Sequence, residues 1–219
     1  MKKMLPVLVI VFFMIFSAVI FTPENASGDT VHNYFNEITN GISIIGNSGF
    51  NSSNYVFEGN GTPEDPYTIS NMTINLSDES SGTGISIQYT SAYFAIENVT
   101  IILNSTNGSG PSAGIYLYNV SNGTLENLNI YAPAYPPTYF VNGTQVYEPD
   151  IDLIGINAFN SERLTIENSR IRNMAQGGID LDYCDQINVS NNFVNYTVID
   201  GLFGFGSYHI NFLSNKLFY

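Results

Sequence analysis

The feature of the sequence that most constrains its fold is a repeat of about 23 residues. Each copy begins with glycine and an aliphatic residue, and an alternating apolar pair follows later in the copy. The last three copies start at positions 155, 178 and 201, which is a constant spacing. A fixed period of this length is typical of a solenoid, in which each copy forms one turn of a coil. The five copies are GISIQYTSAYFAIENVTI (84–101), GIYLYNVSNGTLENLNI (114–130), GINAFNSERLTIENSRI (155–171), GIDLDYCDQINVSNNFV (178–194) and GLFGFGSYHINFLSNKL (201–217).

The apolar residues within each copy alternate with polar ones. In the fourth copy, for example, Ile179 and Leu181 are followed by Ile187 and Val189. A period of two indicates short strands with one face inward, and the Asn, Gly and Ser residues between them are typical of turns. The pattern therefore predicts an all-β fold, a single-stranded right-handed parallel β-helix. We expect about 5–6 turns, stacked ~4.8 Å apart.

Asparagines recur at one position of this pattern, directly after an aliphatic residue and a Glu or Ser. Stacked turns place such residues one above the next, so their amides can hydrogen-bond along the coil. We therefore expect a structural, buried asparagine ladder rather than catalytic residues. In the last copy Ser214 takes this position and Asn215 follows it. The ladder residues are Asn71, Asn98, Asn127, Asn168 and Asn191.

The five copies resemble the repeats of parallel β-helix proteins of the pectate-lyase-like superfamily. The segment GNGTPEDPYTISNMTI (59–74) resembles the start of the β-helix domain in many archaeal secreted and surface proteins. Some of those proteins are described as similar to NosD-type periplasmic copper-associated proteins. The resemblance covers about residues 59–219 and implies the fold. It implies no single function, because the superfamily includes lyases, hydrolases, adhesins and surface proteins.

Residues 1–28 have the pattern of an export signal. MKK is followed by the apolar run LPVLVIVFFMIFSAVIF (5–21), and ASG (26–28) offers small residues for cleavage. This pattern is typical of a cleaved signal peptide, or of a retained N-terminal anchor. Either alternative predicts a secreted protein or one on the extracellular face of the cell envelope. We expect residues 29–58 to form an N-terminal cap or degenerate turn, and residues 59–219 to form the β-helix domain.

The net charge of −13, with only six Lys and Arg residues, argues against nucleic acid as a partner. It also argues against an anionic membrane surface, so we expect membrane contact only through the N-terminal segment. The single cysteine, Cys184, excludes an intramolecular disulfide, and we expect it to be buried as a small apolar residue. Histidine, methionine and cysteine show no clustered spacing, which argues against copper binding.

Two aspartates, Asp180 and Asp182, share the outward face of one predicted strand, and Asp150 precedes the neighbouring copy. Their separation suits the two acids of an inverting glycoside hydrolase, or a Ca²⁺ site formed by Asp180 and Asp182. The simplest interpretation is a solvated strand face of an acidic protein. The motifs N-T-D, D-D and G-H-G, which the resemblance leads us to seek in related glycosidases, are absent. We therefore favour a protein that is not an enzyme and that requires no cofactor.

The insertion at 131–150 is rich in aromatic residues and prolines. Tyr135, Tyr139 and Tyr147 are candidates for stacking against sugars, and the alternative is a lid over the adjoining turns. Asn-x-Ser/Thr motifs are frequent, which fits export with glycosylation. The glycosylation sites that we expect lie in loops, at Asn60, Asn104, Asn107, Asn122 and Asn142.

The sequence thus predicts a secreted or cell-surface β-helix module with a structural or carbohydrate-contacting role. The first alternative is a polysaccharide lyase or glycoside hydrolase that acts on an extracellular polysaccharide. The second is a subunit or fragment of a longer surface solenoid. The last copy carries no polar cap, so this alternative predicts self-association through that turn.

Overall fold

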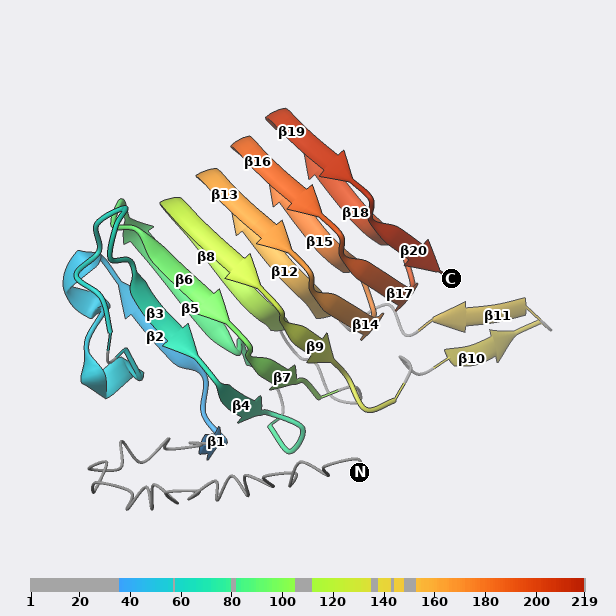
Figure 1. The fold of residues 1–219 in the computed structure, drawn as a ribbon. Helices are drawn as coiled ribbons and strands as arrows, with labels where there is room; N and C mark the ends of the chain where they lie inside the picture. Colours follow the sequence, from blue (N-terminus) through green and yellow to red (C-terminus); the bar gives the residue numbers. More distant parts are fainter. Residues whose placement is uncertain are drawn as a thin grey trace, which may run out of the picture. The chain divides into compact units, whose positions relative to one another are not determined.

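The computed structural model describes residues 36–56, 58–79, 82–104, 112–134, 138–142, 144–147 and 153–218. Most of these residues lie in strands that coil around one core (Figure 1). The helical residues among them form two short 3₁₀ turns, Asn47–Gly49 (η1) and Ser52–Asn54 (η2). Within these ranges no helix has the length and hydropathy that crossing a membrane requires. Residues 1–28, for which we expect a signal peptide or anchor, lie outside the described residues.

The strands form three faces, which we call faces A, B and C. Face A contains β1 (Asn36–Ile38), β4 (Met72–Asn75), β7 (Thr100–Ile102), β9 (Asn129–Tyr131), β14 (Arg170–Met174), β17 (Phe193–Thr197) and β20 (Lys216–Phe218). Face B contains β2 (Ile42–Ile45), β5 (Ile85–Thr90), β12 (Leu153–Phe159), β15 (Gly177–Asp182) and β18 (Asp200–Phe205). Face C contains β3 (Tyr67–Ser70), β6 (Phe94–Glu97), β13 (Glu162–Glu167), β16 (Asp185–Ser190) and β19 (Tyr208–Leu213). The long strand β8 (Ser112–Glu126) passes through both face B and face C.

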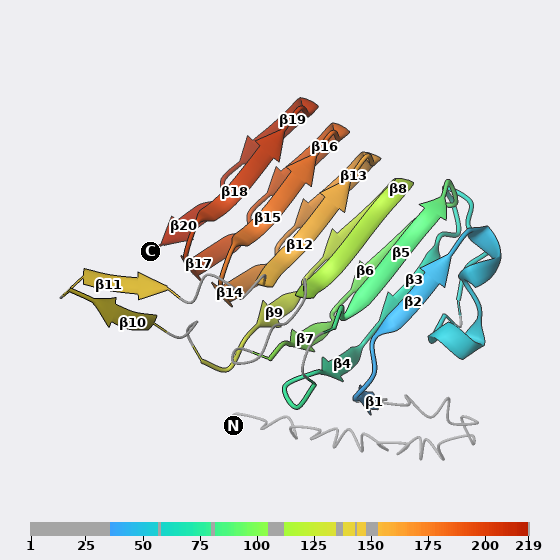
Figure 2. The same ribbon diagram turned by 180° about the vertical axis from the view of Figure 1, so that it is seen from behind.

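Each turn of the coil runs through face B, then face C, then face A. The turn of β12, β13 and β14, for example, is followed by the turn of β15, β16 and β17 (Figures 1 and 2). Neighbouring turns pair in parallel and in register, with Ile156 opposite Ile179 and Leu164 opposite Ile187. This offset of 23 residues is the period of the sequence repeat. The expected parallel β-helix is therefore confirmed.

The insertion at 131–150 leaves this register intact. Strand β8 pairs with β12, so that Ile115 lies opposite Ile156 although the two are 41 positions apart. The excess residues include β10 (Thr138–Val141) and β11 (Thr144–Tyr147), which pair with each other as an antiparallel hairpin. The insertion is thus added outside the coil, where it does not disturb the stacking of the turns.

The core consists of three columns of aliphatic side chains, one behind each face, and each side chain is at most 1% exposed. Full burial of a Leu or Ile side chain contributes about 1.5–3 kcal/mol, so these columns supply the main favourable term for folding. The alternation in the sequence predicted them. They are Ile44, Ile87, Leu117, Ala158 and Leu181 on face B, then Ile69, Ile96, Leu125, Ile166 and Val189 on face C, and Ile74, Ile101, Ile130, Ile171 and Val194 on face A.

The expected asparagine ladder was wrong in its position. Asn71, Asn98, Asn127, Asn168 and Asn191 are exposed, and none of their amides donates to another of the five. All five have positive φ angles, between 52° and 56°. Asparagine tolerates this left-handed conformation better than most residues do, because its short polar side chain can bond locally. These residues therefore recur because the corner between face C and face A requires a left-handed backbone.

An inward polar ladder lies one residue further along the chain, at the buried Ser169 and Asn192 and the half-buried Asn215. The Asn192 Oδ1 atom accepts a hydrogen bond from the Ser169 N–H group at 2.9 Å, and its Nδ2 atom donates to the Ile166 carbonyl oxygen at 2.9 Å. Asn215 repeats this arrangement one turn later: its Oδ1 atom accepts from the Asn192 N–H group at 2.9 Å. These side chains satisfy backbone groups of the preceding turn, which would otherwise be buried without partners.

The corner between face B and face C is built in the same way. Ser161, Cys184 and Ser207 point inward there, and the Ser207 Oγ atom accepts from the Cys184 N–H group at 2.8 Å. Cys184 is a free thiol with 1% exposure, as expected, and burial raises its pKa. It stands in the column between two serines and donates from Sγ to the Ala158 carbonyl oxygen at 3.4 Å.

The glycine that opens each copy has a steric role. A Cβ atom at Gly178 would overlap both the Gly201 carbonyl oxygen and the Val194 side chain. A Cβ atom at Gly155 would likewise overlap the Gly178 carbonyl oxygen and the Ile171 side chain. The entry to face B thus passes so close to the next turn and to face A that only glycine fits.

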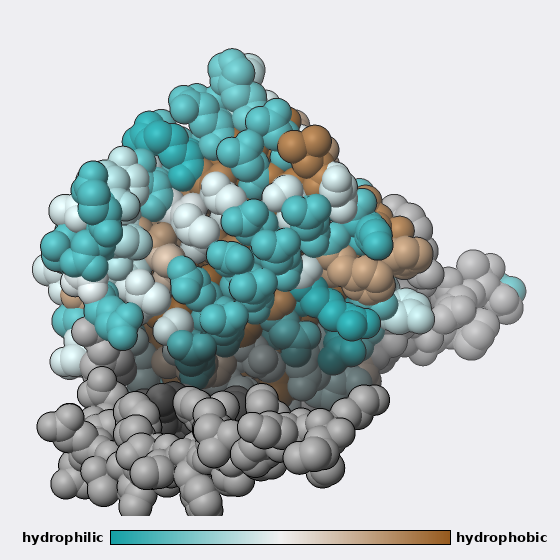
Figure 3. All heavy atoms as spheres, in the orientation of Figure 1, coloured by the Kyte–Doolittle hydropathy of each residue, from teal (hydrophilic) through white to brown (hydrophobic). Residues whose placement is uncertain are grey.

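Exposed apolar side chains concentrate on the turn formed by β18, β19 and β20. Figure 3 shows brown patches toward this end of an otherwise mainly hydrophilic surface. Within the described residues no strand pairs with the far side of this turn. Self-association through it stays a prediction. The exposed residues are Phe203, Phe205, Tyr208, Phe212, Leu213, Leu217 and Phe218.

Replacement of Asn192 should separate the buried ladder from the exposed asparagines. We expect Asn192→Ala to lower the free energy of unfolding by about 2–3 kcal/mol, because it leaves buried backbone groups unpaired. Asn191→Gly should change it by less than about 1 kcal/mol, because glycine adopts positive φ readily. Urea denaturation followed by circular dichroism measures both. Equal losses in the two variants would contradict this assignment of the ladder.

Two glycines of face B provide a second test of the packing. Gly178→Ala should destabilise the fold by about 1–3 kcal/mol, because the new methyl group overlaps backbone of the next turn. Gly204→Ala is the matched control, since the nearest atom to its Cβ would be the Leu181 carbonyl oxygen at 3.7 Å. Thermal unfolding should show a lower midpoint for Gly178→Ala alone. Equal midpoints would show that the turns are not this closely stacked.

Candidate functional site

The structure places Asp180 and Asp182 on the outward side of β15, and both are half-buried. Asp180 lies between Asn157 and Phe203 of the neighbouring turns, and Asp182 lies between Phe159 and Phe205. Asp150 lies outside the described residues. Within the described ranges, no three His, Cys, Asp or Glu residues are grouped so that they could hold a metal ion. A Ca²⁺ site or a catalytic site at Asp180 and Asp182 stays a prediction.

The aromatic insertion is described only in part. Tyr139 and Tyr147 lie on adjacent strands of the hairpin, in β10 and β11, and Tyr135 lies outside the described residues. Their contact with sugars stays a prediction.

The expected glycosylation sites differ in their surroundings. Asn60 and Asn142 are exposed, Asn107 lies outside the described residues, and Asn104 is half-buried. Asn122 is half-buried, and both ends of its amide are hydrogen-bonded. Its Nδ2 atom donates to the Ser91 carbonyl oxygen at 2.9 Å, and its Oδ1 atom accepts from Arg163 Nε at 2.8 Å. Glycosylation stays a prediction at all five.

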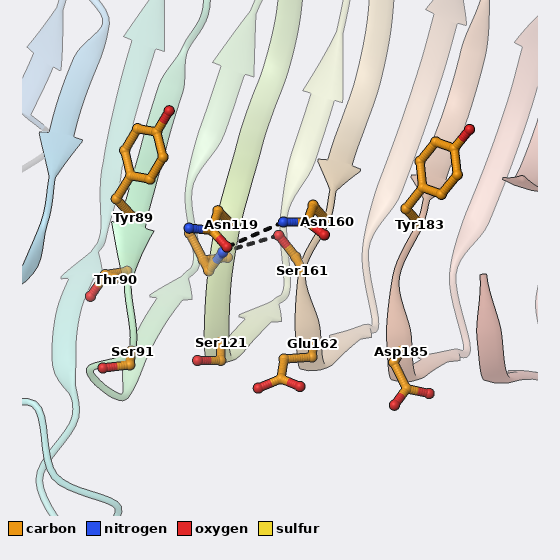
Figure 4. Close-up of a pocket in the computed structure, with 11 residues that line it drawn as sticks. Tyr89, Thr90, Ser91, Asn119, Ser121, Asn160, Ser161, Glu162, Tyr183 and Asp185 are labelled. Atoms are coloured by element: carbon orange, nitrogen blue, oxygen red, sulfur yellow. Dashed lines mark hydrogen bonds between the residues drawn. The ribbon is translucent and has the colours of Figure 1, made fainter. Parts of the chain in front are cut away.

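A groove of about 490 Å³ runs along the corner between faces B and C, and the sequence analysis did not identify it (Figure 4). In the turns that line the groove, the residue directly before the inward corner residue has a positive φ and points its side chain outward. Along four successive turns these residues are Tyr89, Asn119, Asn160 and Tyr183. The two short asparagines lie between two long tyrosines, so the corner is hollow in the middle and has an aromatic wall at each end. The tyrosines are 54% and 52% exposed.

Polar groups form the floor of the groove. The Asn160 Nδ2 atom donates to Asn119 Oδ1 at 3.2 Å, which orients both amides. Beneath them the Ser161 hydroxyl accepts from the Val120 N–H group at 3.2 Å and donates to the Phe159 carbonyl oxygen at 3.0 Å. After these bonds the exposed Asn119 amide still offers its two N–H donors, and Asn160 offers its oxygen.

Glu162 and Asp185 form one edge of the groove, on neighbouring turns (Figure 4). The Glu162 carboxylate forms an ion pair with Arg163. The Asp185 carboxylate bonds to His209 Nδ1 at 2.7 Å and accepts from Gln186 Nε2 at 3.2 Å. The hydrogen bond with His209 has the largest effect on Asp185, and together with that from Gln186 it lowers the pKa of this carboxyl below its usual range.

Ring contacts fix the two walls of the groove to face B. The Tyr89 ring meets the Tyr118 ring edge-on, with 5.1 Å between centroids, and Tyr118 stacks on Phe159 at 5.7 Å. Phe159 in turn meets Tyr183 edge-on at 5.5 Å, and Tyr183 meets Phe205 at 5.5 Å. A continuous row of rings thus links both walls and restricts their rotamers.

Residues 63–218 match the model of a protein family described as the right-handed β-helix region. The chain belongs to this family. The match confirms the expected fold and its handedness, and with it the resemblance to β-helix proteins. Comparisons with curated proteins and with solved structures found no match. The family description names a fold and no reaction, so the narrower likeness to archaeal NosD-type proteins stays a prediction.

Removal of the imidazole beside Asp185 should raise the pKa of that carboxyl toward its usual range. The hydrogen bond from His209 lowers this pKa in the folded protein. It therefore contributes stability that is present at neutral pH and is lost as the pH falls through the lowered pKa. In His209→Ala, a carboxyl carbon NMR titration should show a higher midpoint for Asp185. Tyr208→Ala, which removes an exposed neighbour, is the control, and an unchanged midpoint in His209→Ala would contradict the assignment.

Proposed function

We propose that this chain is a β-helix module that binds neutral carbohydrate outside the cell. The observation that carries the proposal is the groove between Tyr89 and Tyr183, with the Asn119–Asn160 pair as its floor. Aromatic rings stack on the apolar faces of sugars, and amides and hydroxyls bond to sugar hydroxyl groups. The export signal expected in residues 1–28 supports a location outside the cell.

The dimensions of the groove favour a short stretch of a polysaccharide. Tyr89 and Tyr183 are three turns apart, which corresponds to about 14 Å along the coil. The volume of about 490 Å³ lies in the usual range for small-ligand sites. A sugar chain that runs parallel to the coil axis therefore contacts both tyrosines while its hydroxyl groups face the two asparagines.

The charge of the groove favours neutral sugars over acidic ones. Glu162 and Asp185 lie along its edge in a chain with a net charge of −13. Like charges brought together at an interface cost several kcal/mol, so uronic acids and sulfated sugars are disfavoured at this site.

Hydrolysis is the second candidate function, because Glu162 and Asp185 lie next to each other on adjacent turns. Two observations favour binding over hydrolysis. The general acid of a glycoside hydrolase needs a raised pKa, whereas hydrogen bonds lower that of Asp185. Glu162 is engaged in an ion pair with Arg163. Asp180 and Asp182 are not among the residues that line the groove.

Alanine replacement of either tyrosine tests the proposal. With cellohexaose, mannohexaose and xylohexaose as probes, calorimetry should detect binding of at least one by the unchanged protein. Tyr89→Ala and Tyr183→Ala should each weaken it about 10-fold, which corresponds to ~1.4 kcal/mol of lost stacking. Tyr208→Ala, which removes a 69% exposed tyrosine outside the groove, should bind normally.

No binding of any of the three probes, or unchanged binding by both groove variants, would contradict the proposal. The same mixtures should be assayed for new reducing ends. If new reducing ends appear with the unchanged protein and disappear with Glu162→Gln, the function of the groove is hydrolysis and not binding alone.

A further inference from the structure

Positive charge gathers on the outer side of face A. The chain has six Lys and Arg residues, and four of them lie in the described ranges. Of these four, Arg170 and Arg172 are on β14 and Lys216 is on β20, all on outward positions. The fourth, Arg163, lies beside the groove. In an acidic protein, three of the four described basic side chains thus share one face.

These cations alternate with aromatic rings along the coil. Arg170, Phe193 and Lys216 are register partners on three successive turns, and Arg172 has Tyr131 as its partner on the turn before. The Arg170 guanidinium lies 4.9 Å from the centre of the Phe193 ring, and that of Arg172 lies 4.4 Å from the centre of the Tyr131 ring.

The stacked guanidinium groups keep their hydrogen-bond donors available. A cation–π contact uses the flat face of the guanidinium, and its N–H donors remain in the plane for an anion. Within the described ranges, neither arginine nor Lys216 forms an ion pair, and the buried Arg172 Nε atom has no acceptor. An anionic ligand therefore has no described carboxylate to displace from these three cations.

Carboxylates are absent from the outward positions of β9, β14, β17 and β20. Those positions hold Asn129, Tyr131, Arg170, Arg172, Phe193, Asn195, Lys216 and Phe218, of which Asn195 is buried. The exposed Tyr196 follows Asn195 on β17. At physiological salt the Debye length is about 8 Å, so acidic groups that lie farther than this from the three cations are largely screened from them. Face A therefore attracts anions locally although the whole chain is negative.

We propose that face A binds an acidic polysaccharide, with its carboxylate or sulfate groups on Arg170, Arg172 and Lys216. The Phe193 and Tyr131 rings hold the two guanidinium groups in place. Three features point to a sugar polymer. Charges and rings alternate in one line, they repeat at about 4.8 Å per turn, and Arg170 and Lys216 lie two turns, ~10 Å, apart. This site is independent of the groove at the corner of faces B and C, which favours uncharged ligands.

Binding of two acidic probes at about 0.15 M salt tests the proposal. Oligogalacturonate supplies carboxylates and dextran sulfate supplies sulfates, and the unchanged protein should bind at least one of them. The double variant Arg170→Gln/Lys216→Gln should bind at least about 10-fold more weakly. Both side chains are exposed, so the fold should be retained, and circular dichroism checks this. Arg163→Gln removes one charge beside the groove and should leave this binding unchanged.

Three results would overturn the proposal. The first is no binding of either probe by the unchanged protein, and the second is equal binding by the double variant. The third is binding of a polyglutamate peptide as tightly as of the saccharides, which would assign face A to acidic polypeptides. Tyr183→Ala should leave the binding of acidic probes unchanged, so failure of the groove proposal and failure of this one are distinguishable.

Discussion

The structure depends on the exact stacking of each turn on the next. Aliphatic columns favour collapse, but they do not select which residue stands above which. Inward polar side chains at the corners do select it, because Ser161, Ser169 and Asn192 each bond to backbone of a neighbouring turn. A shift by one residue would leave these groups buried without partners and would turn the apolar columns toward solvent.

The same corners create the functional surface. At the corner between faces B and C the inward residue follows a residue with positive φ whose side chain points outward, as Ser161 follows Asn160 and Cys184 follows Tyr183. The coil therefore displays one outward side chain per turn along a straight line. The identity of that residue is free to vary without disturbing the core, and two asparagines between two tyrosines produce the groove. Face A uses the same regularity with arginine, lysine and aromatic residues.

The sequence predicted the fold well, because glycine–aliphatic starts and alternating apolar residues are direct signatures of stacked strands. It misplaced the asparagine ladder by one residue. Both Asn191 and Asn192 fit a polar corner, and only the backbone conformation decides which one points inward. The outward row was difficult to recognise because insertions separate its members by 30, 41 and 23 positions. The positive face was hidden within a strongly negative total charge.

Mapping a neutral oligosaccharide onto the protein by NMR tests the central claim most directly, namely that the outward corner residues form the binding surface. Titration with cellohexaose, mannohexaose or xylohexaose, whichever binds most tightly, should shift the amide signals of Tyr89, Asn119, Asn160 and Tyr183. The signals of face A, such as that of Arg170, should stay in place. Shifts confined to face A, or none at the corner between faces B and C, would contradict the account.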